Sequence, residues 1–133
     1  MAALGSSRLD PTAPCPCGSG RGYDACCGPV VRNERSAEGP EELMRSRYTA
    51  YAVNDVDHLF RTWHPRTRPE EIAPDDGLTW AGLEVLDVET GETTGVVEFR
   101  AHWRWNGQRG SLHERSRFEV RGGRWVYLDG EKY

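Results

Sequence analysis

Residues 97–105, VEFRAHWRW, carry the most regular pattern in the chain: odd-numbered positions are apolar and even-numbered positions are charged or histidine. Because successive side chains of a β-strand point to opposite faces of a sheet, this alternation predicts a strand with one buried and one solvated face. Asn106-Gly107 follows directly, and this dipeptide is typical of a tight hairpin turn. The stretch therefore predicts part of an antiparallel sheet.

The segments after and just before this strand extend the predicted sheet, and further upstream the spacing of apolar residues changes from two residues to three or four. Further strands are predicted at residues 83–88, 112–120 and 124–128, with turns at residues 90–95 and 122–123. Upstream, apolar residues recur at three- and four-residue spacing over residues 40–53 and 56–63, which predicts two amphipathic helices, with Asn54 or Asp55 as a cap between them. Helices followed by antiparallel strands indicate an α+β fold with the helices on one face of a curved sheet.

The composition excludes several classes of protein. No run reaches the roughly 18 apolar residues of a membrane span, so no membrane span is expected. Residues 1–14 show no basic region followed by an apolar one, so no secretory signal is expected and a cytoplasmic location is predicted. The net charge of −4 argues against a nucleic-acid partner. Arginines of the predicted strands alternate with Glu98 and Glu119, which favours a salt-bridged, solvated sheet face over an RNA-binding stripe.

All four cysteines, Cys15, Cys17, Cys26 and Cys27, fall in the pattern C-x-C-x8-C-C. Cysteines this close in sequence close no useful disulfide loops, so a metal site is the favoured interpretation. Four thiolates suit one zinc ion in tetrahedral coordination. The alternative is a patch of reduced thiols without metal.

The chain is predicted to have four parts. Residues 1–14 form a flexible leader, residues 15–30 a zinc knuckle, residues 31–39 a linker and residues 40–133 the α+β domain. Because the α+β part has apolar faces of its own, the knuckle and this domain are expected to be separate modules.

Three stretches resemble known sequences. Residues 14–28, PCPCGSGRGYDACCG, are similar to the SEC-C motif, the zinc-binding tail of the preprotein translocase ATPase SecA. Residues 45–65, RSRYTAYAVNDVDHLFRTWHP, and 113–130, HERSRFEVRGGRWVYLDG, resemble the YchJ family of small bacterial proteins. The resemblance implies a SEC-C motif before a cystatin-like, nuclear transport factor 2-like cone. It also implies an export chaperone or the ribosome as candidate partner of the knuckle.

A cone of this kind leaves a pocket between its helices and its sheet. Strand parity places Glu114 and Ser116 inward, together with Phe118. One hypothesis makes Glu114 a general acid or base beside His64. In that arrangement the pocket would be lined by Trp103, Ser116, Trp125 and Tyr127.

The favoured interpretation of Glu114 is a structural ion pair with Arg47 or Arg45, in which case Glu114→Gln should strongly destabilise the fold. No catalytic motif is present, and a closed four-thiolate set leaves no open position for catalysis. The favoured function is therefore a zinc-binding adaptor whose knuckle docks a protein partner. The alternative is a small-molecule-binding protein or acid/base enzyme that uses the cone pocket around Glu114.

Overall fold

The computed structural model describes residues 10–72 and 77–133 of the chain. The helical elements are η2 (Tyr23–Ala25), α1 (Cys27–Val31), α2 (Pro40–Val53) and α3 (Val56–Arg61). The strands are β1 (Thr79–Thr90), β2 (Thr94–Trp105), β3 (Gln108–Arg121) and β4 (Arg124–Lys132). The predicted order of helices followed by strands is confirmed, and so is the α+β class. No helix among the described residues has the length and apolar character that crossing a membrane requires.

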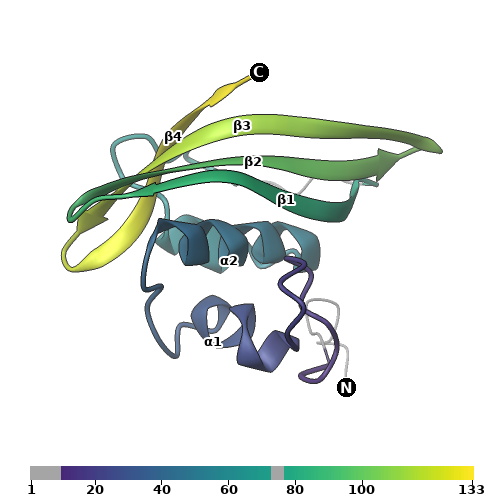
Figure 1. Ribbon diagram of the computed structural model, residues 1–133, viewed down its shortest axis with the longest axis horizontal. Coiled ribbons are helices and arrows are strands. Elements are labelled where there is room, and N and C mark those ends of the chain that lie inside the picture. Colours follow the sequence, from purple (N-terminus) through teal and green to yellow (C-terminus); the bar gives the residue numbers. More distant parts are fainter. Residues whose placement is uncertain (1–9, 73–76) are drawn as a thin grey trace.

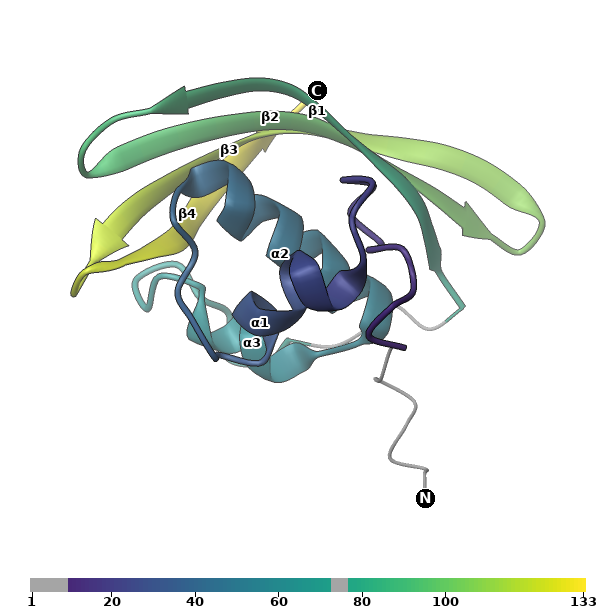
Figure 2. The same ribbon diagram turned by 60° about the horizontal axis from the view of Figure 1, so that its bottom comes forward.

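The four strands form one antiparallel sheet in the order β1-β2-β3-β4. This sheet curves over α2, and α1 lies on the opposite side of α2 (Figure 1). Figure 2 shows the same layers from below, with the sheet wrapped around α2 and with α1 and α3 in front. The N-terminal segment, α2 and the sheet therefore form three successive layers.

The β2–β3 hairpin has the predicted turn. Asn106 and Gly107 have φ angles of 52° and 79°, as a two-residue hairpin turn of the primed type requires. Both strands are longer than predicted. β3 begins at Gln108 rather than at residue 112, because pairing continues to the turn itself, where Gln108 pairs with Trp105, and β2 begins at Thr94, which pairs with Glu119.

The alternation along β2 buries one face, as predicted. Val97, Phe99 and Ala101 are at most 5% exposed and face α2. The pattern weakens toward the turn, where Trp105 is 48% exposed. The hairpin extends past the helical layer there (Figure 1), so none of the described helices covers the apolar side of its tip.

The two capping residues have separate roles. Asn54 takes a left-handed conformation with φ 65° and ends α2, and Asp55 accepts a hydrogen bond from the backbone N–H of His58 and begins α3. Asp55 is the N-cap because a carboxylate satisfies free N–H groups at a helix start.

The cysteine segment is not separate from the rest of the core. All four cysteines belong to the same cluster of buried residues as Leu43 and Tyr48 of α2 and Phe99 of β2. α1 packs directly on α2. The buried core therefore does not divide at the predicted linker of residues 31–39.

Candidate functional site

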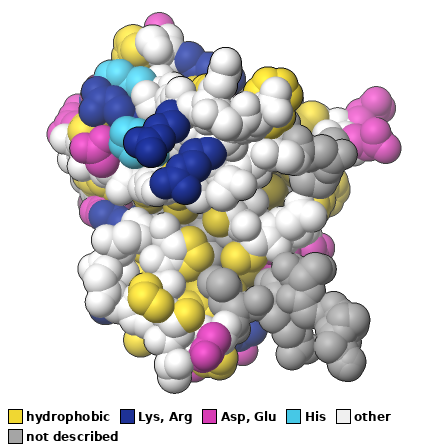
Figure 3. Space-filling model, turned by 90° about the vertical axis from the view of Figure 1, so that its right-hand side faces the viewer, with side chains coloured by type: hydrophobic (Ala, Val, Ile, Leu, Met, Phe, Trp, Pro, Cys, Tyr) yellow, Lys and Arg dark blue, Asp and Glu magenta, His cyan; other side chains and the backbone are white. Residues whose placement is uncertain are grey.

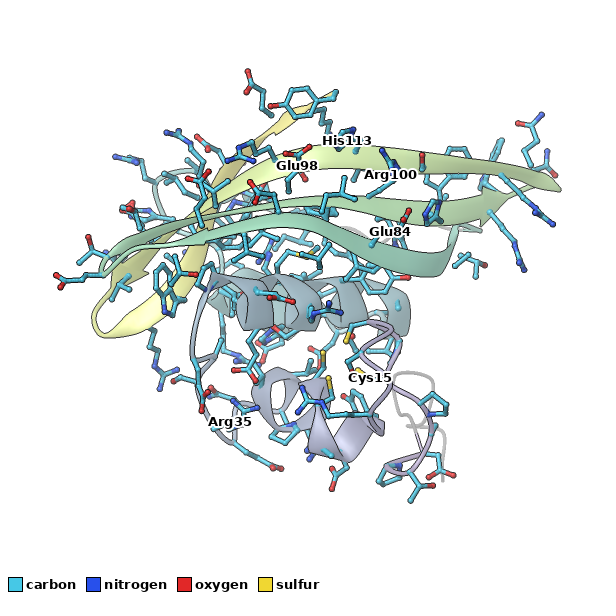
Figure 4. All side chains as sticks on the ribbon, viewed as in Figure 1. Cys15, Arg35, Glu84, Glu98, Arg100 and His113 are labelled. Carbon is cyan, nitrogen blue, oxygen red and sulfur yellow. The ribbon has the colours of Figure 1, made fainter. Side chains whose placement is uncertain are left out.

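The four cysteines meet between the N-terminal segment and α2. Cys15 and Cys17 lie on a tight turn in which the Cys15 backbone N–H donates to the Arg21 carbonyl, and Gly18 and Gly20 have φ angles of 78° and 90°. Glycine is the residue that adopts such angles without strain. Cys26 and Cys27 follow at the junction of η2 and α1. The turn and the helix start thus direct four side chains to one point, and Figure 4 shows Cys15 on the side of α2 away from the sheet.

The distances within the cluster fit a metal ion. The four Sγ atoms all lie within 4.8 Å of one another. The Cys17 and Cys26 Sγ atoms are 3.6 Å apart, and those of Cys26 and Cys27 are 4.0 Å apart. Thiolates at about 2.3 Å from a tetrahedrally coordinated ion would be about 3.8 Å from one another. The arrangement is therefore compatible with metal binding, and all four side chains are at most 4% exposed.

Neighbouring polar groups complete the cluster. The Ser19 hydroxyl is 3.1 Å from the Cys26 Sγ, and the Arg21 guanidinium is 3.8 Å from the same atom. Arg45 of α2 donates to the Cys17 carbonyl at 2.9 Å. Four thiolates around a divalent ion carry a net negative charge, which the two guanidinium groups offset.

Hydrogen bonds among the thiols separate their pKa values. Donation from Cys15, followed by donation from Cys27, lowers the pKa of Cys17 well below its usual range. The hydrogen bonds that Cys27 makes to Cys15 and Cys17 raise the pKa of Cys27, and desolvation acts in the same direction. The cluster thus favours a thiolate, the form of cysteine that binds metal ions, at Cys17.

A second site lies on the other side of α2, between that helix and the concave face of the sheet. This cone cavity has a volume of about 400 Å³, within the roughly 300–1,000 Å³ range of ligand pockets. Its walls come from α2, the segment after α3, and all four strands. The lining residues are Met44, Arg47, Tyr48, Tyr51, Trp63, Trp80, Phe99, Ala101, Leu112, Glu114, Ser116, Phe118, Tyr127 and Lys132.

Glu114 faces this cavity, as its strand parity predicts, and it is 9% exposed. Its carboxylate accepts a hydrogen bond of 3.3 Å from the Tyr127 hydroxyl and packs on Gly130 of the neighbouring strand. Burial raises the pKa of Glu114 above its usual range, and the charge of Lys132 opposes this shift. Glu114 is therefore a desolvated carboxyl group at the cavity wall.

The predicted ion pair between Glu114 and an arginine is absent from the part of the chain that the structure describes. Arg47 donates from Nη1 to the Leu59 carbonyl and the Thr62 hydroxyl, which hold it toward α3. Arg45 pairs with Glu41 on the opposite face of α2, because residues two positions apart on a helix point in nearly opposite directions. That prediction is wrong.

Only some of the predicted pocket residues come together. Ser116 and Tyr127 line the cavity, whereas His64, Trp103 and Trp125 do not. The His64 Nδ1 accepts from the Arg66 backbone. The Trp103 ring packs over Gly110, and Trp125 lines a separate space near His58. Glu114 thus lacks the predicted histidine beside it. Strand parity showed which face of the sheet each tryptophan is on, but not whether its position along the strand lies at the cavity.

Sequence reasoning assigned Arg47 only as a partner for Glu114 and missed its aromatic environment. The guanidinium lies 4.8 Å from the ring centre of Trp63 and 4.6 Å from that of Tyr127. Met44, Arg47, Tyr48 and Tyr51 share one face of α2 by their three- and four-residue spacing. That spacing is a signal that could have placed Arg47 in the cavity.

The outer face of the sheet is charged and internally paired, as predicted. His102 contacts Glu84 at 2.8 Å, and His113 contacts Glu98 at 2.8 Å. Arg115 bridges Glu98 to acidic residues of β1. Of these side chains, Glu98 and His113 are seen to point away from the helices (Figure 4). Figure 3 shows arginine or lysine and histidine side chains gathered at the top of the molecule, with hydrophobic side chains below.

Comparison with known proteins agrees with both parts of the structure. Residues 12–29 match the SEC-C motif. Residues 39–130 match the model described as the YchJ middle NTF2-like domain.

Several relatives extend along nearly the whole chain. A UPF0225 protein of Streptomyces coelicolor is 52% identical over 91% of this chain and 97% of its own length. A UPF0225 protein of Deinococcus radiodurans is 52% identical over 90% of this chain and 89% of its own length.

Two solved structures have a similar fold. The solution structure of RPA3114, a SEC-C motif containing protein from Rhodopseudomonas palustris, has a TM-score of 0.81 and 41% identity, covering 90% of this chain and 98% of that one. The crystal structure of a SEC-C motif containing protein from Psychrobacter arcticus has a TM-score of 0.71 at 24% identity, covering 86% and 80%, and supports the fold alone. The chain belongs to the YchJ family of UPF0225 proteins, with a SEC-C motif before an NTF2-like domain.

Proposed function

We propose that the protein binds one zinc ion through Cys15, Cys17, Cys26 and Cys27, and that this ion fixes the N-terminal segment against α2. The observation that carries the proposal is the convergence of four buried Sγ atoms within 4.8 Å. Four soft thiolates in tetrahedral geometry select zinc over the hard, oxygen-preferring cations. Since all four positions around the ion would be filled by protein, its role is structural.

Elemental analysis of protein purified under reducing conditions tests this proposal. One equivalent of zinc per chain is expected in the wild type, and Cys17→Ser should lose it. Ser19→Ala is the matched control, because Ser19 contacts the Cys26 Sγ but is not one of the four cysteines. A wild-type protein with far less than one equivalent of zinc, or with another metal in its place, would contradict the proposal.

A docking role for the knuckle is part of the same proposal. The turn around the cysteines exposes Gly18, Gly20, Arg21 and Asp24 to solvent, while the ion and the core hold the backbone of this turn in one conformation. Such a surface suits a protein partner, and the likeness of the motif to the SecA tail makes an export chaperone or the ribosome the candidates. A pulldown with wild-type protein and with the Asp24→Arg variant tests it: Asp24 is exposed and its carboxylate contacts Arg32 rather than a cysteine, so the variant should keep its zinc and lose the partner.

The cone cavity supports a second candidate function, the binding of a small molecule. Its volume of about 400 Å³ and its aromatic walls with a few polar groups are the features of a ligand site. No histidine lies among its lining residues, so a ligand-binding role is better supported than the predicted Glu114–His64 acid/base pair.

A further inference from the structure

The charges at the cone cavity carry an inference about the ligand, which rests on the proposed ligand-binding function. Arg47 is 6% exposed and lines the cavity. Its Nη1 hydrogen bonds reach two neutral oxygens, of Leu59 and Thr62. None of the ion pairs in the described part of the chain includes Arg47. A buried cation is costly without a counter-charge, and burial lowers the pKa of Arg47 to about 10.

The aromatic rings hold Arg47 in place. Trp63 and Tyr127 lie on its guanidinium at 4.8 and 4.6 Å, and cation–π contacts of this kind stabilise a positive charge by about 0.5–2 kcal/mol. The rings do not replace an anion, because they carry no net negative charge. They also accept no hydrogen bond from the N–H groups at the edge of the guanidinium plane. Arg47 is thus a fixed positive group at the cavity wall.

The remaining charged groups at the cavity make an anionic occupant more favourable than a cationic one. Lys132 adds a second positive charge, and Glu114 is the acidic lining residue. With Glu114 ionised, Arg47, Lys132 and Glu114 together carry one net positive charge. A ligand carboxylate would neutralise this charge, whereas a ligand ammonium group would double it. Protonation of Glu114, which burial favours, increases this preference for an anion.

The rest of the cavity surface is aromatic or aliphatic. Tyr48, Trp80 and Phe99 contribute rings from α2, β1 and β2, and flat rings stack well on flat apolar bodies. We propose that the cavity binds a small carboxylic acid with a flat apolar body, its carboxylate beside Arg47 and its body among these rings. A planar carboxylate is also the anion that matches the planar guanidinium group.

Three probes with one body and different head groups test the head-group preference. These are 2-naphthoate, 2-naphthylmethanol and 2-naphthylmethylammonium, each titrated by calorimetry into zinc-loaded, full-length protein near neutral pH. We expect 2-naphthoate to bind about tenfold or more tightly than the other two, because it alone gains a charge-assisted hydrogen bond. In NMR spectra, the indole N–H signals of Trp63 and Trp80 should shift on binding, and that of the distant Trp105 should not.

Variants identify the charged residue that is responsible for the preference for 2-naphthoate. Arg47→Met removes the guanidinium and keeps the apolar stem, so the acid should lose its advantage over the alcohol. Arg104→Met is the matched control on the exposed outer face of the sheet, and it should bind as the wild type does. If Arg47→Met does not fold, Lys132→Met serves instead, and a several-fold loss of 2-naphthoate affinity is expected because Lys132 lies at the exposed end of the cavity.

Two results would overturn the inference, and they differ in whether they also contradict the proposed ligand-binding function. Equal or tighter binding of the ammonium probe, with shifts at Trp63 and Trp80, would refute the anion preference but leave ligand binding in place. No binding of any probe, in protein with one equivalent of zinc, would refute both the inference and the proposed ligand-binding function.

Discussion

Replacing Glu114 by glutamine separates two arrangements of the cone cavity. If Glu114 had a buried ionic partner, removal of its charge would leave an arginine unpaired and would cost about 3–5 kcal/mol. In the structure its carboxylate accepts a hydrogen bond of 3.3 Å from the Tyr127 hydroxyl, and a glutamine carbonyl can accept the same hydrogen bond. We therefore expect the free energy of unfolding to change by no more than about 1 kcal/mol near neutral pH, where the sequence alone predicted a large loss.

The pH dependence of this variant gives a second, signed test. Burial raises the pKa of Glu114 above the usual value of 4.5 for a glutamate side chain, so the folded protein binds this proton more tightly than the unfolded chain does. The stabilisation from protonation is complete below the unfolded pKa and is lost as the pH rises through the folded pKa. Glutamine does not titrate, so the wild type should gain stability relative to Glu114→Gln as the pH falls from 7 toward 4.

Urea denaturation of both proteins, followed by tryptophan fluorescence at several pH values in this range, measures both effects. Glu92→Gln, in the exposed turn between β1 and β2, is the control for loss of one surface carboxylate. A loss of 3–5 kcal/mol for Glu114→Gln near neutral pH, with Glu92→Gln unchanged, would show that Glu114 has a strong charge partner and would refute the arrangement described above.

Three further predictions follow from single residues. Burial lowers the pKa of His58 to about 3 from 6.5. The contribution of His58 to stability should therefore be complete above about pH 6.5 and decline below it, by about 2 kcal/mol between pH 7 and pH 5. Urea titrations in which His58→Gln loses as much stability as the wild type over this range would contradict this prediction. Cys17→Ser should lower the denaturation midpoint of the whole domain, since the cysteines share its core; near-UV circular dichroism that melts as in the wild type would instead indicate independent modules. Gly130→Ala should displace the Glu114 carboxylate into the cavity, because an alanine Cβ would overlap it, and calorimetry should then give a weaker affinity for 2-naphthoate; an unchanged affinity would contradict this placement.

The sequence predicted the features that depend on local periodicity and spacing. The alternation in residues 97–105 identified the buried face of β2, and the same parity placed Glu114 and Ser116 at the concave face. The spacing of the four cysteines predicted one cluster, and their Sγ atoms do converge. In each case a short segment of backbone geometry determines which way neighbouring side chains point.

The sequence did not predict which inward-facing residues meet, because that depends on contacts between distant segments. His64 precedes a proline and looked available for catalysis, but its backbone N–H donates to the Tyr127 carbonyl and its Nδ1 accepts from Arg66. Arg47 looked like the partner of Glu114, but the end of α3 supplies its hydrogen-bond acceptors. Each pairing depends on how the end of α3 docks beside β4, which no local pattern encodes.

α2 connects the two candidate sites, because its opposite faces line them. Arg45 and Thr49 contact the cysteine segment, the first at the Cys17 carbonyl and the second at the Cys15 Sγ. Arg47 and Tyr51 line the cavity on the other side. Residues two positions apart on a helix diverge by about 200°, so 14 residues of α2 suffice to form a wall of each site. Holding the N-terminal segment against α2 therefore also fixes the rotation of the helix, and with it the position of the Arg47 guanidinium at the cavity wall.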